Sequence, residues 1–326
     1  MGEVILGEVG WRVVAAGQNG TSVSDFVIHV LGQTPFTRTW LPILLLSTLF
    51  GLLLHRVQGR KLGVLLPKDW VSVRTDVMLL MTGNAALFVR PLLVPAATLG
   101  AVVGWFGDPS GAAPGLWAWA VFGVLHFGFS EFVYWLLHWA RHRFDALWVF
   151  HAIHHSADYL NPLTGFRRHP VEIALLSLCL DLPNYLPYGL LVWLYPGVPP
   201  ESVLLFVVAR ALFVATYANL LHSHVWMSFG PLGERILLSP AMHQIHHSVK
   251  EGEAMSNYGQ ILSVFDAWFG TAVYAHEVNP EELVVGVEGL KHTTVFDIFV
   301  RPLMDFVQVA RGGTWTALGV DSDRRS

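Results

Sequence analysis

The chain has 326 residues, which allows one large domain or two small ones, and only 13% of them are charged. Soluble domains carry about 25% charged residues. A chain that is 53% apolar, with a mean hydropathy of +0.48, therefore lacks the polar surface of a soluble globular protein. The net charge of −4 argues against a nucleic-acid partner, which would require a basic patch. The single cysteine, Cys179, excludes a disulfide framework and a cysteine-rich metal site, whereas 16 histidines are a large excess.

Apolar runs, taken in chain order, predict an all-α fold, namely a polytopic membrane helix bundle of about four to five spans. A helix needs about 20 predominantly apolar residues to cross a bilayer. The Gly-rich N-terminal segment 1–39 shows no apolar core of a signal peptide, and we expect residues 40–326 to form a single membrane-embedded domain. The spans are predicted at about 40–54, within 77–106, and at about 116–137, 171–194 and 202–221.

The distribution of Lys and Arg predicts the orientation of these spans. Positive residues gather in segments 55–75 and 138–170, whereas the connections 107–115 and 196–200 contain none. Since positively charged loops stay in the cytoplasm, the N-terminus is expected outside and residues 222–326 inside, as a cytoplasmic cap. The chain is thus predicted to be an integral, multi-pass protein of the cytoplasmic membrane in a bacterium, or of the endoplasmic reticulum in a eukaryote.

Apolar residues from Phe296 to Ala310 recur at helical spacing and predict a helix over residues 295–311, which Pro302 would kink. Such a stripe suits a helix that lies in the membrane interface. It equally suits a helix that packs on the cytoplasmic cap, and both interpretations stay open.

Ten of the sixteen histidines lie just inside the predicted inner membrane face. Residues at i and i+4, and at i and i+3, share a helix face, so each H-x-x-H-H triplet is expected to project three imidazoles from one side of a helix. Nine imidazoles exceed what one four-coordinate ion can use and predict two neighbouring metal ions, for which imidazole suits iron, copper, nickel or zinc. The predicted ligands are His138, His142, His151, His154, His155, His222, His243, His246 and His247.

The pattern His138-x3-His142, His151-x2-His154-His155 and His243-x2-His246-His247 resembles the three histidine boxes of the fatty acid hydroxylase/sterol desaturase superfamily of membrane di-iron enzymes. The resemblance covers about residues 125–272. It includes the stretches 150–172 and 229–248, the NYG that begins at Asn257 and the FDAWFGT that begins at Phe265.

The chain departs from the family pattern at two positions. Trp139 stands where the family often has Arg, and His224 stands where relatives commonly carry Asn. His222 is therefore the expected ligand and His224 the doubtful one, since two positions along a helix turn a side chain by about 200°.

The resemblance also implies residues that position the ligands, because metal-bound imidazoles usually donate their other N–H to a carboxylate or a carbonyl. Each candidate equally suits a plain structural role, such as a helix cap or a loop hydrogen bond. The candidates from the resemblance are Glu131, Asn161, His169 and Asp266. Asn219, one turn before His222, is a further candidate that would reach a metal through water.

The function that the resemblance implies is oxidation of an unactivated C–H position of a lipid, by hydroxylation or desaturation. The cofactors would be two iron ions, which zinc or another divalent metal can replace in purified material, with O2 as co-substrate. The lipid, of sterol, fatty acyl, carotenoid or alkylglycerol type, would enter from the bilayer. Electrons would come from a separate donor protein of ferredoxin, cytochrome b5 or reductase type, because the chain has no nucleotide-binding glycine fingerprint and no cysteine cluster.

The competing hypothesis is a membrane metal transporter, or a metal-binding protein with a histidine-rich cytoplasmic site. Transporters place ionisable ligands within the spans near the midplane, whereas these histidines gather at one predicted membrane face. The metalloprotease motif H-E-x-x-H is absent.

Overall fold

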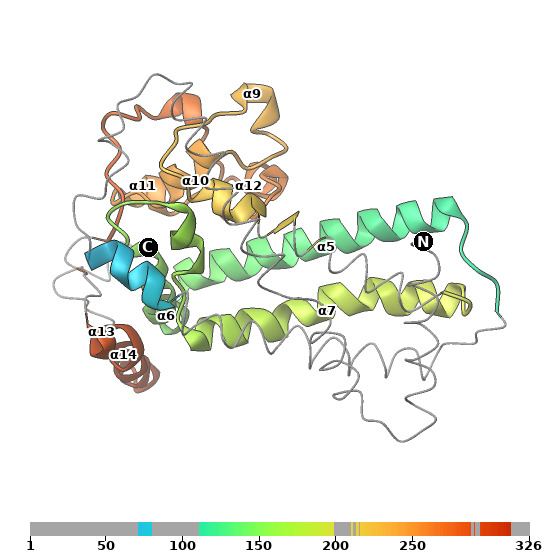
Figure 1. Ribbon diagram of the computed structural model, residues 1–326, viewed down its shortest axis with the longest axis horizontal. Helices are drawn as coiled ribbons and strands as arrows, with labels where there is room; N and C mark the ends of the chain where they lie inside the picture. Colours follow the sequence, from blue (N-terminus) through green and yellow to red (C-terminus); the bar gives the residue numbers. More distant parts are fainter. Residues whose placement is uncertain are drawn as a thin grey trace, which may run out of the picture. The chain divides into compact units, whose positions relative to one another are not determined.

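The computed structural model describes residues 71–79, 111–198, 210, 213–214, 216–287, 290 and 294–313 (Figure 1). The N-terminal segment 1–39, the predicted span at 40–54 and most of those at 77–106 and 202–221 lie outside these residues. The described part is helical, and the isolated bridges Leu237–Leu262 and Ser248–Val285 are the β pairings within it.

Figure 1 shows the helices of the described residues, which follow in chain order. Residues 71–79 and 216–221 are also helical. The named α-helices are α5 (Leu116–Arg143), α6 (Asp145–His155), α7 (Pro170–Leu194), α9 (Gly230–Gly233), α10 (Pro240–His246), α11 (Glu251–Ala254), α12 (Val264–Phe269), α13 (Val295–Phe299) and α14 (Arg301–Ala310), and the 3-10 helices are η2 (Pro162–Phe166) and η3 (Ala275–Glu277).

Two helices of the described residues, α5 and α7, are long and apolar enough to cross a membrane. They coincide with the third and fourth predicted spans. The total number of spans and the cytoplasmic position of the cap remain predictions.

The chain divides into two compact units, each of which contains one half of both long helices. In the first unit, Phe122 of α5 packs against Tyr188 and Leu191 of α7. The second unit, which comprises residues 46–85, 131–179 and 214–326, contains all of the predicted site residues.

A single residue, Phe144, separates α5 from α6. Its extended backbone (φ −110°, ψ 121°) ends the first helix, and its carbonyl accepts the backbone N–H groups of Leu147 and Trp148 in the first turn of the second. From Trp148 to His155 every residue of α6 is buried. The chain therefore passes directly from a candidate membrane span into a helix enclosed by protein.

The helix expected over residues 295–311 is two helices, because the backbone turns at Val300 between α13 and α14. Pro302 lies in the first turn of α14, where proline needs no hydrogen-bond partner for its nitrogen. On the inner side, Ile298 packs with Leu79 and Ile153, and the ring of Phe306 lies 5.6 Å from that of Phe150. The two helices thus pack on α6.

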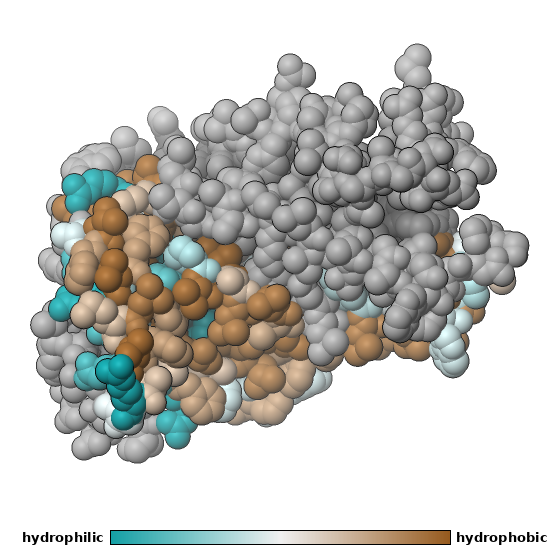
Figure 2. Space-filling model, turned by 90° about the horizontal axis from the view of Figure 1, so that it is seen from below, coloured by the Kyte–Doolittle hydropathy of each residue, from teal (hydrophilic) through white to brown (hydrophobic). Residues whose placement is uncertain are grey.

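The outer side of α13 and α14 is apolar and open. Figure 2 shows apolar side chains, drawn in brown, over most of the described surface on the face seen from below. The exposed apolar residues of the two helices are Val295, Phe296, Val300, Leu303, Met304, Phe306 and Val307.

Candidate metal centre

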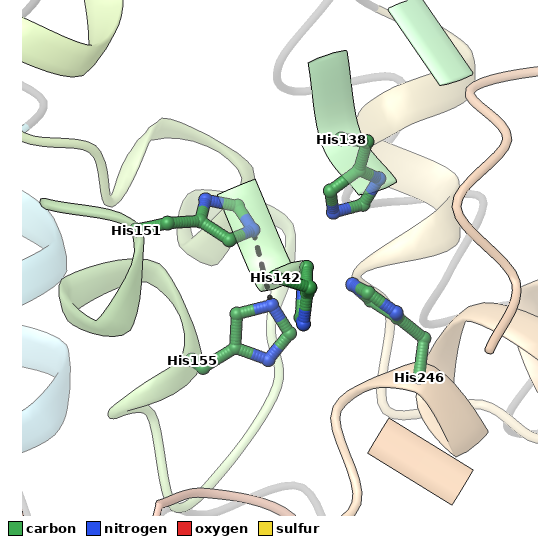
Figure 3. Close-up of side chains that lie close together, drawn as sticks. All are labelled: His138, His142, His151, His155 and His246. Carbon is green, nitrogen blue, oxygen red and sulfur yellow. Dashed lines mark hydrogen bonds between the residues drawn. The ribbon is translucent and has the colours of Figure 1, made fainter. Parts of the chain in front are cut away.

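The nine predicted histidines come together in the second unit as two buried groups. Within each group the potential ligand atoms all lie within 4.8 Å of one another, and no ring of either group is more than 3% exposed. Figure 3 shows the five-histidine group, whose rings converge from three sides. It consists of His138, His142, His151, His155 and His246, and the four-histidine group consists of His154, His222, His243 and His247.

Each H-x-x-H-H triplet is divided between the two groups. His151 and His155 of α6 join the five-histidine group, whereas His154 joins the other. The triplet at α10 divides in the opposite sense, since His246 alone joins the five-histidine group. Neighbouring positions differ by about 100° around a helix, so the middle histidine of each triplet lies about 60° from the first and about 100° from the last. The three imidazoles of a triplet thus share a broad helix face, but they reach two different groups.

Backbone carbonyls fix the tautomer of three of these histidines. The Nδ1 atoms of His138, His246 and His222 lie 2.8, 2.7 and 2.7 Å from the carbonyl oxygens of Tyr258, Ser256 and Ala218. Because a carbonyl can only accept, each Nδ1 carries the proton and each Nε2 presents a lone pair. Within the described residues, the buried Nε2 atoms of His138 and His246 have no hydrogen-bond partner.

The lone pairs of the four-histidine group meet at one place. The Nε2 atom of His222 lies 3.1 Å from that of His154 and 2.9 Å from that of His243, and both ring nitrogens of His247 are buried without a hydrogen-bond partner in the described part of the chain. Buried nitrogens are rarely left unsatisfied. A cation held between the rings would satisfy them, and imidazole is a good ligand for iron, copper and zinc. The residues present therefore fit a metal ion in each group.

Burial keeps these imidazoles neutral. It lowers the pKa of His222 to about 4 and that of His246 to about 3. It also lowers the pKa of His151 to about 4, although the nearby carboxylate of Glu172 acts in the opposite direction. Since a neutral imidazole is the form that binds metal, the groups are ready for a cation at pH 7. Burial likewise holds the pKa well below its usual range for His154, His155, His243 and His247.

A buried ion pair touches the five-histidine group. The Oε1 atom of Glu172, in the first turn of α7, lies 2.9 Å from Nδ1 of His151 and accepts a hydrogen bond from Arg141 of α5. From the sequence, Arg141 counted only among the positive residues of segment 138–170, and Glu172 only as the last residue of the stretch 150–172. Both residues are charged and lie at the end of an apolar run in a chain with few charges. This feature could have identified Arg141 and Glu172 as candidate site residues.

The loop after α11 supplies the carbonyls that hold His246 and His138. Asn257, between Ser256 and Tyr258, has a left-handed backbone (φ 56°), which Asn tolerates better than most residues. Its side-chain amide donates to the carbonyls of Met242 in α10 and Val273. The loop is thereby tied to the helix that carries the third histidine box.

Two of the predicted positioning residues act on this same loop. Asp266 accepts the backbone N–H groups of Tyr258 and Gly259 at 2.8 and 2.9 Å, and Glu131 accepts those of Ile261 and Leu262 at 2.8 and 3.2 Å. Asp266 therefore supports His138 indirectly, because it holds Tyr258, whose carbonyl contacts the histidine.

Asn161 belongs to a network that supports the end of α6. It caps η2 and donates to Asp76 at 2.8 Å. Asp76 pairs with the buried Arg167 at 3.0 Å, and Arg167 donates to the Ile153 carbonyl and to the Ser156 hydroxyl, both at 3.0 Å. Neither Asp76 nor Arg167 was predicted from the sequence as part of the site.

The remaining candidates lie at different distances from the two groups. His169 accepts from the backbone N–H of Val171 and lies 3.4 Å from the Phe299 carbonyl, outside both groups. Asn219 is buried one turn before His222, and a Cβ atom added to Gly165 would lie 3.3 Å from His222 and 3.5 Å from Asn219. Only a glycine fits there without displacing a neighbour. His224 also lies outside both groups, and its ring stacks on Tyr159 at 6.0 Å.

This placement predicts opposite outcomes for two histidines that are two positions apart. His222→Ala is expected to lose most of the bound metal and of the activity, because its Nε2 lone pair contacts two other rings of the four-histidine group. His224→Asn is expected to keep most of both. Metal analysis of the two purified variants is the measurement, and loss of metal from His224→Asn alone would reverse the assignment.

Comparisons with known proteins agree with the histidine pattern. Residues 123–271 match the family described as fatty acid hydroxylase. The chain is 30% identical over 176 residues to ornithine lipid hydroxylase OlsE of Rhizobium tropici, which covers 54% of this chain and 48% of that protein. It is 28% identical over 175 residues to alkylglycerol monooxygenase of Homo sapiens, covering 54% and 34%, and 28% identical over 159 residues to that of Caenorhabditis elegans, covering 49% and 27%.

The matched part of the chain thus corresponds to about half or less of the length of these curated relatives. No solved structure matches. The matched region begins within α5 and ends just beyond α12, and it contains all nine clustered histidines. Residues 123–271, which hold both histidine groups, are thus similar to the fatty acid hydroxylase family.

Proposed function

We propose that the protein hydroxylates a membrane lipid, with two iron ions bound by the five- and four-histidine groups and O2 as co-substrate. The observation that carries the proposal is the pair of adjoining groups of buried, neutral imidazoles. The rings of His155 and His247, one from each group, lie only 4.3 Å apart between centroids. Two ions held by groups that adjoin in this way would be neighbours, as a two-metal centre requires.

The names of the relatives favour hydroxylation over desaturation and point to a lipid. One relative is an ornithine lipid hydroxylase and others are alkylglycerol monooxygenases. Iron bound here would supply the activation of O2 needed to oxidise an unactivated C–H bond. The sterol, fatty acyl, carotenoid and alkylglycerol types all remain candidate substrates.

The side chains around the histidines would exclude water and hold the ligand rings in place. Trp148 lies 5.0 Å from the ring of His142 and 5.4 Å from that of His155. Tyr258 covers another side, 5.2 Å from the ring of His142. A dry surrounding of this kind protects a reactive centre from side reactions.

The remaining components of the reaction are supplied from outside the chain. In the proposal, the lipid enters from the bilayer, beside α5 and α7, and the active site faces the cytoplasm. Electrons come from a separate ferredoxin, cytochrome b5 or reductase.

Lipid profiling of cells with and without the gene tests the proposal. The expected result is a lipid that gains one oxygen atom only when the intact protein is present, together with about two iron ions per purified chain. A metal transporter, the competing function, would bind metal and change no lipid. Loss of two hydrogens from a lipid would show desaturation instead.

We also propose that the outer face of α13 and α14 lies in the bilayer interface. Arg301 lies among its exposed apolar residues in the sequence and Arg311 follows them, both of which suit anionic headgroups, and the chain contains candidate membrane spans. A fluorophore on Met304→Cys, in a chain whose native Cys179 is replaced by Ser, is expected to be quenched by brominated lipids. The same fluorophore on Glu281→Cys, in an exposed polar loop, is the control. Equal quenching at the two positions would contradict the proposal.

A further inference from the structure

The surroundings of the two histidine groups differ in charge. His151, in the five-histidine group, faces the carboxylate of Glu172 at 2.9 Å, and this side chain is only 2% exposed. In the four-histidine group, His222 faces a neutral carbonyl. Among the described residues, the Nδ1 atoms of His154, His243 and His247 have no hydrogen-bond partner at all. The contact between a carboxylate and an imidazole nitrogen is thus found on one side of the centre.

Glu172 is itself held by a cation. Arg141 donates to the same Oε1 atom that faces His151, and its guanidinium lies 3.5 Å from Nδ1 of that histidine. Its Nε atom donates to the carbonyl of Leu137, one turn earlier in α5. The Oε2 atom of Glu172 accepts no hydrogen bond from the described residues. Glu172 therefore contacts both a buried cation and a candidate ligand through one carboxylate oxygen, and it supplies the negative charge that both face.

We infer that Glu172 is a positioning residue that makes the five-histidine group the tighter of the two metal positions, and that Arg141 weakens this effect while holding the carboxylate in place. The inference rests on the proposed function. A carboxylate that accepts from a ligand imidazole fixes its tautomer, keeps Nε2 free for the metal and strengthens it as a donor. A carbonyl gives the same orientation without the charge.

The inference predicts effects of opposite sign for the two members of the ion pair. Glu172→Gln keeps the size of the side chain but leaves Arg141 as an uncompensated cation beside the site, so the five-histidine group should bind a divalent metal about 10- to 100-fold more weakly. Arg141→Met leaves the carboxylate and removes the cation, so the same group should bind more tightly than in the wild type. The double variant, which is neutral again, should fall between the two. A purely structural ion pair would weaken metal binding in all three variants.

The experiment uses the full-length protein in detergent, loaded with Co(II), whose absorption reports the geometry of each ion. Bound metal per chain is measured against increasing chelator. Two release steps are expected for the wild type. Only the second release step, assigned to the five-histidine group, should move. It should occur at a lower chelator concentration in Glu172→Gln and at a higher chelator concentration in Arg141→Met. Glu253→Gln, a carboxylate that contacts Ser248 and Lys250 instead, is the control and should leave both steps unchanged.

The outcomes separate this inference from the proposed function. If the wild type binds about two ions and both single variants release them earlier, or neither variant differs from the wild type, the positioning role is wrong while the metal centre stands. If the wild type binds no metal, the proposed function fails with it. Should Glu172→Gln not fold, Glu172→Asp, which keeps the charge, and Arg141→Met still decide the question, because only a charge effect predicts tighter binding in the latter.

Discussion

Alanine at His246 is expected to lower lipid hydroxylation by at least about 100-fold and to remove metal from the five-histidine group. The ring of His246 lies between 4.5 and 4.7 Å from those of His138, His142 and His155, so its loss opens the group at its centre. Substitution of residues that merely orient a ligand already costs 10- to 100-fold in metal affinity or activity, and loss of a ligand should cost no less.

The matched variants are His247→Ala and His151→Ala. His247 is the next residue but belongs to the four-histidine group, so its loss should be equally severe while removing the other ion. His276→Ala, an exposed histidine outside both groups, should keep full activity. Hydroxylated lipid and metal per chain are measured on folded, membrane-inserted protein. Full activity in both His151→Ala and His246→Ala would contradict the two-metal interpretation.

Asp76→Asn is expected to destabilise the protein by about 3–5 kcal/mol, the usual cost of breaking a buried ion pair by removing one partner. Asp76 is fully buried and Arg167 is 1% exposed. Without the carboxylate, the guanidinium would remain as an uncompensated charge beneath the end of α6. Since Arg167 also donates to the Ile153 carbonyl, beside His154 and His155, metal should be lost at a lower temperature as well.

Thermal unfolding in detergent, followed together with metal release, measures this effect. Arg301→Ala is the control, because Arg301 is 41% exposed and contacts Asp297 at 3.4 Å. Such surface pairs contribute about 0–1 kcal/mol. An Asp76→Asn protein as stable as the wild type would show that the pair does not hold the helix.

The sequence could predict which histidines would cluster, but not how they would divide. The spacing of His151, His154 and His155 fixes their positions around α6, because a helix has a constant rotation per residue. It carries no information on how α6 faces α10, and that orientation decides which rings share a group. The contacts of the Ser256 and Tyr258 carbonyls with His246 and His138 could not be predicted either. Every residue has a backbone carbonyl, and only the conformation of the folded loop directs these two toward the histidines.

The positive residues of segment 138–170 were interpreted only as evidence for membrane orientation, but several of them also have structural roles. Arg141 and Arg167 were counted as evidence for the cytoplasmic side, yet both are buried in ion pairs. Arg168 donates to Tyr134. Among the arginines of this segment, Arg143 is the one that the structure leaves exposed. Arginines that form buried ion pairs are no evidence for the side of the membrane on which a loop lies. The predicted topology therefore depends more heavily on segment 55–75, most of which lies outside the described residues.

The packing of α14 on α6 has a practical consequence for the isolated protein. One side of α6 carries three candidate metal ligands, and other positions of the helix are supported by Phe306 of α14, which contacts Phe150, and by Ile298 of α13, which packs with Ile153. Two helices that contribute no candidate ligand, α13 and α14, therefore stabilise the position of the helix that carries three of them. Detergents that displace α13 and α14 from α6 should therefore release bound metal before the helical fold is lost, which metal analysis and circular dichroism of the extracted protein would show.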